Sequence, residues 1–210
     1  MSGKYMAYVG SYSYTGKAKG ITVFDVDVEN GMFKERCEIE VDNSSYVIAS
    51  SDGKTLYSIA DEGVVSFRIL PNGSLARLNS APIRGMRGCH LCTDEEDKYV
   101  FVSGYHDGKT TVLSLNPDGS VGKIVDGVFD RGYGSVAERN FRPHVTCTRR
   151  MPDNRFVLSV DNGIDQVKIY RFNDKEQRLV QVDAIRCELE SAPRHFRYSK
   201  DGKFIYLMYA

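Results

Sequence analysis

Apolar and polar residues alternate along the chain in short runs separated by polar turns, and this period-two pattern predicts β-strands. One unit recurs four times: a polar turn, one Lys or Arg, and then an apolar run. Its copies are Ser50–Ala60, Asp94–Gly104, Met151–Asp161 and Ser199–Tyr209. The basic residue stands at Lys54, Lys98, Arg155 and Lys203, at intervals of 44, 57 and 48 residues. Repeats of about 40–50 residues are typical of propellers with four-stranded blades.

The pattern predicts four strands in each full repeat and no helix. A short strand precedes each turn, at Val47–Ala49, Leu91–Thr93, Val145–Thr148 and Phe196–Tyr198. The apolar run after the turn forms the second strand, at Thr55–Ile59, Tyr99–Ser103, Phe156–Val160 and Phe204–Tyr209. Alternating and then weaker outer strands follow at Val64–Ile69, Leu75–Leu78, Thr110–Leu115, Lys123–Val128, Gln166–Phe172 and Leu179–Ile185. Three further strands come first, at Tyr5–Ser11, Gly20–Val28 and Glu35–Val41.

We therefore expect an all-β fold, a partial β-propeller that forms a single domain over residues 1–210. The expected divisions are N-terminal strands in 1–43, blades at 44–82, 83–130 and 140–187, and an incomplete blade at 191–210. An incomplete ring leaves unpaired strand edges, which favour pairing with another chain. We thus expect the chain to be a fragment or to self-associate through these edges.

The composition of the chain limits the binding partners and the cellular compartment that we expect. Lys and Arg total 28, as do Asp and Glu, so the formal net charge is zero. This balance argues against nucleic acid or an anionic membrane as a partner, since both attract a basic excess. The sequence contains no apolar run of about 18 residues and no secretory signal pattern. Five thinly spread cysteines indicate reduced thiols. We expect a cytoplasmic protein.

Three histidines and one tyrosine stand at the start of the short first strands: Tyr46, His90, His144 and His195. The first strand of a propeller blade lies nearest the axis, so the repeat should place these side chains around one end of the central channel. Imidazole titrates near neutral pH and serves as base, acid or hydrogen-bond donor. The alternative is that each histidine hydrogen-bonds to the backbone at its blade corner. His106, on a turn, has the same two interpretations.

Arginines provide candidate anion sites. Arg194 precedes His195, where its permanent charge could bind a phosphate or carboxylate or stabilise an oxyanion. The alternative is a salt bridge between blades. The long insert Asp126–Arg142 is rich in Gly and carries Arg131, Arg139 and Arg142. Its backbone N–H groups and arginines could contact phosphate, but the loop matches no phosphate-binding pattern, which favours an ordinary surface loop.

Two pairs of potential ligands have a spacing that suggests zinc: Cys89 with Cys92, and His144 with Cys147. Residues i and i+3 of a strand point to opposite faces, however. Each pair is therefore unsuited to one metal ion, and buried core cysteines are the better interpretation. We expect no metal site and no cofactor.

Several motifs together resemble one known family. They are Tyr8-Val9-Gly10-Ser11-Tyr12, Gly20-Ile21-Thr22-Val23-Phe24-Asp25, Cys89-His90-Leu91, Tyr105-His106-Asp107-Gly108, Arg142-Pro143-His144-Val145, Val160-Asp161 with Gly163 and Asp165, and Ala192-Pro193-Arg194-His195-Phe196. In this order the set resembles the lactonase family of seven-bladed propellers, which includes bacterial 6-phosphogluconolactonase and fungal muconate-lactonizing enzymes. Compared with a complete seven-bladed propeller, the chain corresponds to the first two-thirds of a family member.

The resemblance implies a metal-independent lactonase that hydrolyses an anionic sugar-phosphate lactone, 6-phosphogluconolactone, in the pentose phosphate pathway. It implies catalytic roles for His144 and Arg194, and we expect His90, His106, Arg142 and His195 to bind substrate. The family pattern has a second His where this chain has Thr146, and a Glu where it has Ala210. Two alternatives stay open: lactone-forming cycloisomerisation in the same family, and a non-catalytic propeller scaffold that binds a partner at the channel.

Overall fold

The computed structural model describes residues 5–134 and 141–210, and within them it contains seventeen strands and no helix. Each predicted strand is present, with ends that differ from the prediction by a few residues. The all-β prediction is therefore confirmed. No helix among the described residues is long and apolar enough to cross a membrane.

The strands form five antiparallel sheets that follow one another in chain order. The first sheet has three strands, β1 (Tyr5–Gly10), β2 (Gly20–Asp27) and β3 (Met32–Glu40). The second has four, β4 (Val47–Ala49), β5 (Thr55–Ala60), β6 (Gly63–Ile69) and β7 (Leu75–Ala81). The third has β8 (His90–Thr93), β9 (Tyr99–Gly104), β10 (Lys109–Leu115) and β11 (Val121–Phe129).

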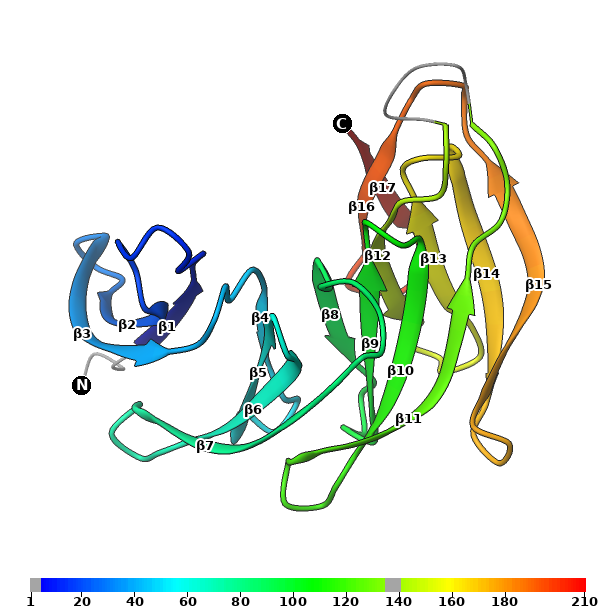
Figure 1. Cartoon of the computed structure of the whole chain (residues 1–210). Coiled ribbons are helices and arrows are strands. Elements are labelled where there is room, and N and C mark those ends of the chain that lie inside the picture. Colours follow the sequence, from blue (N-terminus) through cyan, green and yellow to red (C-terminus); the bar gives the residue numbers. More distant parts are fainter. Residues whose placement is uncertain (1–4, 135–140) are drawn as a thin grey trace.

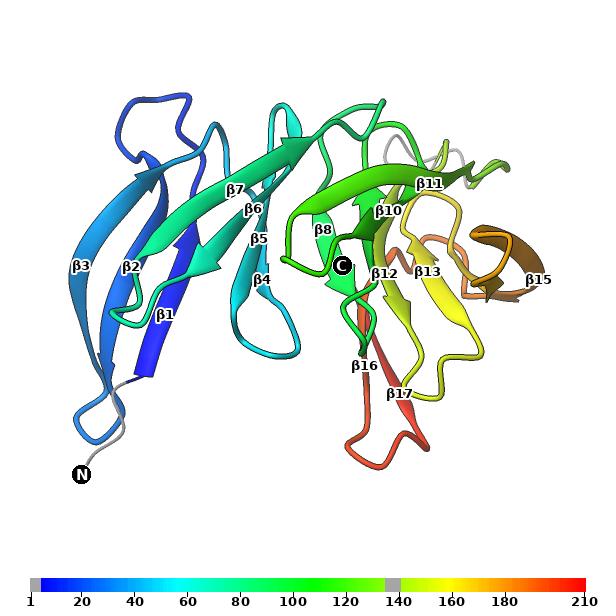
Figure 2. The ribbon, with the colours of Figure 1, turned by 90° about the horizontal axis from the view of Figure 1, so that it is seen from below.

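The fourth sheet contains β12 (Val145–Arg150), β13 (Val157–Asp161), β14 (Gln166–Asn173) and β15 (Arg178–Arg186). The fifth pairs β16 (Pro193–Tyr198) with β17 (Ile205–Tyr209). Within each four-stranded sheet the strand order equals the chain order, as in a propeller blade. Figure 2 shows the sheets in succession, from β1–β3 at the left to β12–β15 at the right.

The first strands of successive blades lie next to one another (Figure 1). β8 contacts both β4 and β12, and β12 contacts β16. Each blade thus contributes its first strand to the inner side of the arc. The residues that begin these strands are brought together at one end, as the repeat predicted.

The core consists of four apolar clusters, one between each pair of neighbouring sheets. The central strand β9 shows why the apolar runs are continuous. Tyr99 and Phe101 pack toward the fourth sheet, while Val100 and Val102 pack toward the second. A blade strand is covered on both faces, so both sets of alternating side chains must be apolar.

The polar turns of the repeat stabilise themselves through their own side chains. Asp52 Oδ1 accepts hydrogen bonds from the Lys54 N–H and the Ser50 hydroxyl, and Asp201 repeats both contacts with Lys203 and Ser199. Such Asx-type turns fix the entry into the second strand of each blade. These aspartates therefore have a structural role, as their place in the repeat indicated.

Candidate functional site

A cavity of about 520 Å³ lies at the end of the arc where the first strands begin. Its walls come from loops and strand starts of all five sheets. The lining residues are Tyr12, Tyr46, Arg87, Gly88, Cys89, Tyr105, His106, Thr146, Asn162, Arg194, His195 and Ala210. A volume of this size accommodates a small-molecule ligand.

Two β-bulges shape the cavity wall. Val145 pairs with Asp161 and Cys147 with Val160, so Thr146 is an extra residue in β12. Arg194 is likewise an extra residue in β16, because Pro193 pairs with Tyr209 and His195 with Met208. Bulges redirect side chains and are common beside active sites. The Thr146 hydroxyl donates a 2.7 Å hydrogen bond to the Arg194 carbonyl, which joins the two bulges.

Two guanidinium groups face the cavity, from Arg87 and Arg194. Arg87 is held by a 2.9 Å ion pair with Asp61 and lies 4.9 Å from the centre of the Tyr12 ring. Arg194 is exposed, and the described residues provide no ion-pair partner for its guanidinium. An uncompensated guanidinium at a cavity wall is suited to bind an anionic group.

Of the six residues predicted to act at the site, three line the cavity: His106, Arg194 and His195. His106 is exposed and stands edge-on to Tyr105, with ring centroids 5.4 Å apart. His195 is half-buried, and burial lowers its pKa, with Arg197 and Arg149 lowering it further. Its imidazole is therefore neutral at neutral pH.

His144 lies behind the cavity wall. Its ring stacks on Tyr105, with centroids 4.3 Å apart, and its Nδ1 is 2.7 Å from the Tyr105 carbonyl oxygen. Because a carbonyl only accepts, Nδ1 carries the proton and Nε2 is left with the basic lone pair. Burial lowers the pKa of His144. The alternative interpretation of His144, in which the histidine hydrogen-bonds to the backbone at its blade corner, predicted a contact of this kind.

The other two predicted residues do not line the cavity. His90 is fully buried and packs between Tyr46 and His195, at ring-centroid distances of 4.8 and 5.2 Å. Arg142 is exposed and lies over the Phe141 ring. In the insert, Arg131 is exposed as well, while Arg139 lies outside the described residues. The roles of His90 and Arg142 in substrate binding stay predictions.

The cysteine and histidine pairs with zinc-like spacing do not converge on one point. Cys89 Sγ approaches the Val145 carbonyl at 3.4 Å, and Cys92 Sγ approaches the Thr93 carbonyl at 3.1 Å. The His144 ring faces Tyr105, whereas Cys147 Sγ lies 3.6 Å from His90 Nε2. The close Cys–His contact therefore joins two different blades, which sequence spacing could not show.

A family model described as lactonase, seven-bladed β-propeller, matches residues 6–209 of the chain. The chain belongs to this lactonase family. It is 31% identical to the 6-phosphogluconolactonase of Bacillus subtilis, over 98% of the chain and 59% of that protein. It is 27% identical to the 6-phosphogluconolactonase of Formosa agariphila, over 95% of the chain and 60% of that protein.

Solved structures give the same result. The fold matches a candidate 6-phosphogluconolactonase from Bacteroides fragilis with a TM-score of 0.90 and 31% identity, over 99% of this chain and 62% of that one. It matches the periplasmic gluconolactonase of Pseudomonas aeruginosa with a TM-score of 0.89 and 25% identity, over 97% and 61%. The chain thus spans about 60% of the length of the relatives it matches.

Thr146 and Ala210, the positions at which the resemblance leads us to expect a second His and a Glu, both line the cavity. Thr146, in place of the second His, provides a hydroxyl that is already bonded to the Arg194 carbonyl. Ala210, in place of the Glu, provides a methyl group, and its N–H donates to the Ala192 carbonyl at 3.0 Å. Neither replacement can transfer a proton in the way that His or Glu does.

Proposed function

We propose that the protein hydrolyses the lactone of a phosphorylated sugar acid, with 6-phosphogluconolactone as substrate. The observation that carries this proposal is the guanidinium of Arg194, which has no ion-pair partner within residues 5–134 and 141–210, on the wall of a cavity that Arg87 and two imidazoles also line. One cation is available for the phosphate and one for the reacting carbonyl. The names of the relatives from Bacillus subtilis and Formosa agariphila support the same substrate.

In the proposed reaction, water attacks the lactone carbonyl and the ring C–O bond breaks. The Arg194 guanidinium stabilises the negative charge that develops on the carbonyl oxygen. A neutral imidazole takes the proton of the attacking water and returns it to the departing alkoxide. The products are the open sugar-acid phosphate and the regenerated imidazole.

His144 is the proposed base because its tautomer is fixed. The hydrogen bond from Nδ1 to the Tyr105 carbonyl keeps Nε2 unprotonated, and burial lowers the pKa of the ring. Since Tyr105 itself lines the cavity, a small movement of its ring would open a path to His144. His106, which lines the cavity directly, is the neighbouring imidazole that would act in its place.

The charges on the cavity wall suggest how the substrate lies. Arg87 is fixed by Asp61 and by the Tyr12 ring, so it presents its remaining N–H groups in a defined direction. We assign the phosphate to Arg87, with Arg142 as a further contact, and the lactone ring to the side of Arg194 and His106. Opening this lactone is a step of the pentose phosphate pathway, and we propose that the protein carries out this step in the cytoplasm.

The direct experiment incubates the purified protein with 6-phosphogluconolactone and measures acid release, corrected for spontaneous hydrolysis. We expect a rate above background, and a higher kcat/KM than for glucono-1,5-lactone, which lacks the phosphate. No rate above background would overturn the proposal. In a parallel incubation with muconate, conversion of muconate into its lactone would favour the cycloisomerase instead. A folded protein that turns over neither compound would favour the scaffold.

A further inference from the structure

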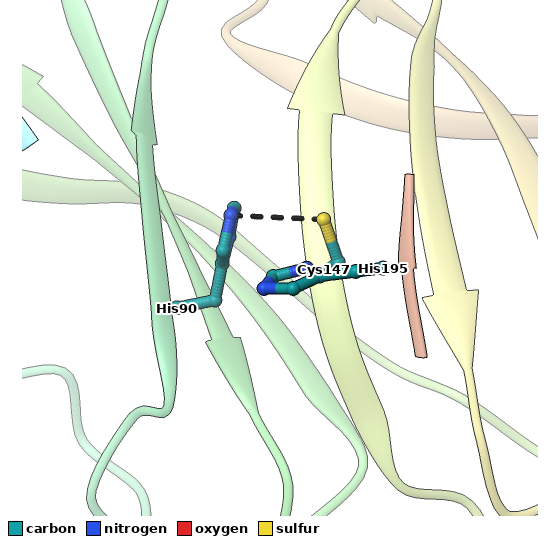
Figure 3. A group of neighbouring side chains, drawn as sticks. All are labelled: His90, Cys147 and His195. Atoms are coloured by element: carbon teal, nitrogen blue, oxygen red, sulfur yellow. Dashed lines mark hydrogen bonds between the residues drawn. The ribbon is translucent and has the colours of Figure 1, made fainter. Parts of the chain in front are cut away.

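Three potential metal ligands from three different blades lie close together (Figure 3). His90 comes from the start of β8, Cys147 from β12 and His195 from β16. Each residue offers one ligand atom, and these atoms lie within 4.8 Å of one another. Because neighbouring first strands pack side by side, the three ligands belong to the rigid inner side of the fold rather than to mobile loops.

The hydrogen-bonding capacity of this cluster is not used up. His90 and Cys147 are both 0% exposed. The Nδ1 atoms of His90 and His195 are buried and have no hydrogen-bond partner within the part of the chain that the structure describes. Buried polar atoms nearly always have a partner. The His90 atom nearest the thiol is Nε2 and not Nδ1, so the unpartnered Nδ1 atoms show spare hydrogen-bonding capacity in the cluster, while Nε2 is the ligand atom that His90 offers.

We propose that His90, Cys147 and His195 bind a thiophilic metal ion of the d¹⁰ type, Cu(I) or Zn²⁺. Such ions prefer thiolate and imidazole ligands. The distance from His90 Nε2 to Cys147 Sγ is 3.6 Å. A tetrahedral site with metal–nitrogen and metal–sulfur bonds of about 2.05 and 2.3 Å has an edge of about 3.6 Å between these atoms. His195 then needs only a side-chain adjustment to complete the site.

The surrounding charges decide which of the two ions fits better. The guanidinium groups of Arg149 and Arg197 lie close to the cluster and act on both imidazoles. They disfavour additional positive charge. A thiolate with Cu(I) is neutral, whereas a thiolate with Zn²⁺ carries one positive charge. Cu(I) is therefore the ion that we expect to bind more tightly.

The coordination is open on one side. No fourth His, Cys, Asp or Glu joins the cluster among the described residues, and His195 is also part of the cavity wall. A metal held by three protein ligands retains a position for water or another small ligand. The site would thus connect the buried interior to the cavity, and His90 and His195 would serve as metal ligands instead of substrate contacts.

This inference does not depend on lactone hydrolysis, so the experiment that tests it measures metal binding and not enzymatic activity. The protein, stripped with a chelator, is titrated with Co²⁺ as a spectroscopic probe, and then with Zn²⁺ and with Cu(I) against competing chelators. We expect one ion per chain, a thiolate-to-Co²⁺ charge-transfer band in the near ultraviolet, and tighter binding of Cu(I) than of Zn²⁺ after correction for the competitor.

Variants locate the site. Cys147→Ser should abolish the charge-transfer band and weaken binding of Zn²⁺ and Cu(I) at least 100-fold, whereas Cys187→Ser, at a half-buried thiol outside the cluster, should leave both unchanged. His195→Ala, at a half-buried position, gives a second variant if Cys147→Ser does not fold. Absence of stoichiometric binding, or binding that neither Cys147→Ser nor His195→Ala weakens, would overturn the proposal as an adventitious ion only.

Discussion

Asp161 holds the corner of the blade on which His144 stands. Its Oδ1 accepts hydrogen bonds from the N–H groups of His144 and Gly163, at 2.8 and 2.9 Å. Burial and the neighbouring carboxyl of Asp130 raise the pKa of Asp161. Asp130 in turn accepts the Tyr170 hydroxyl and lies 3.6 Å from Lys168 Nζ. The folded protein therefore keeps a proton on this pair that the unfolded chain releases.

The pair predicts a pH dependence of stability. An unfolded Asp loses its proton near pH 4, whereas the pair retains one until higher pH. Its contribution to the unfolding free energy is thus largest below about pH 4 and is lost as the pH rises through the raised pKa. We expect Asp161→Asn to remove this loss of stability with rising pH, because the amide N–H donates a hydrogen bond to Asp130 at every pH.

Denaturant unfolding of both proteins at intervals between pH 5 and pH 8 measures the effect. Relative to the wild type, the variant should gain stability by more than about 1 kcal/mol over this range. Comparing the two cancels the opposite contribution of the neutral, buried histidines, which stabilise the fold as pH rises. A stability difference that is constant from pH 5 to pH 8 would contradict the assignment of the shared proton.

The proposed base predicts the acid limb of the activity profile. Burial lowers the pKa of His144 from its usual value, so the imidazole has already lost its proton, and can act as a base, at neutral pH. We expect kcat/KM for the lactone to rise with pH and to reach its plateau before pH 7. In His144→Gln, kcat should fall by 10²-fold or more, as for general bases elsewhere, and this limb should disappear. If the acid limb persists in His144→Gln and is lost in His106→Gln, the general base is His106 and not His144.

The repeat brought some of the predicted residues to the cavity and not others: Arg194 and His195 line it, whereas His90 and His144 do not. His195 and Arg194 stand at a corner whose position in the blade could be counted, and both line the cavity. Arg87 and Tyr12 also line it, but they come from loops without a repeat signature. The bulges at Thr146 and Arg194 depend on backbone pairing, which residue types do not reveal. The position of His144 behind the cavity wall depends on its stacking with Tyr105, which the sequence does not reveal either.

At the scale of the strands, a cluster of buried hydroxyl groups joins two neighbouring blades. Thr148 Oγ1 of β12 lies 3.0 Å from Ser103 Oγ of β9, 3.3 Å from Thr110 Oγ1 of β10 and 3.1 Å from Ser159 Oγ of β13. All four residues are buried. Such a fully satisfied network fixes how the blades pack, because an apolar contact between the same strands would tolerate sliding.

Thr148→Val keeps the shape and removes the central hydroxyl. Ser103 then loses its partner at full burial, so we expect the unfolding free energy to fall by about 1–3 kcal/mol. Thr148→Ser keeps the hydroxyl and should cost about 1 kcal/mol for the lost methyl group. Chemical denaturation of both variants tests the order. A Val variant as stable as the Ser variant would show that the hydroxyl network contributes nothing to the packing.

The strands themselves were predictable because blade strands carry a period-two pattern on two covered faces. Their ends were less so. The outer strand of each full blade is longer than predicted, and its pairing contains a bulge, as between Ser66 and Phe67 or between Ile169 and Tyr170. A bulge inserts one residue and interrupts the alternation, so the polarity pattern fades before the strand ends.

At the scale of the molecule, four inter-sheet clusters stabilise the arc, while its two ends are open. Within the described residues β1 pairs only with β2, and β17 only with β16. The side chains of β17 include Tyr206 and Met208, which are 61% and 59% exposed. Unpaired, apolar edge strands are templates for pairing with another chain. We propose that the 210-residue chain self-associates through these edges as its concentration rises.

Sedimentation velocity over a range of concentrations measures this association. We expect the mean mass of the wild type to rise with concentration, and the double variant Tyr206→Lys, Met208→Lys to stay closer to the monomer, because edge lysines oppose pairing. Tyr133→Lys, at an exposed loop position away from the edge, is the control that should behave as the wild type. A wild type that is monomeric at every concentration would contradict the open-edge account.

The central claim is that the uncompensated Arg194 guanidinium supports lactone opening in the cavity. It is tested most directly by kcat/KM for 6-phosphogluconolactone in Arg194→Ala beside the wild type. Arg186→Ala, exposed at the end of the outer strand β15, is the control. We predict a loss of 10²-fold or more for Arg194→Ala, the usual effect of removing an oxyanion-stabilising donor, and no change for Arg186→Ala. An Arg194→Ala protein that is folded and as active as the wild type would contradict the account.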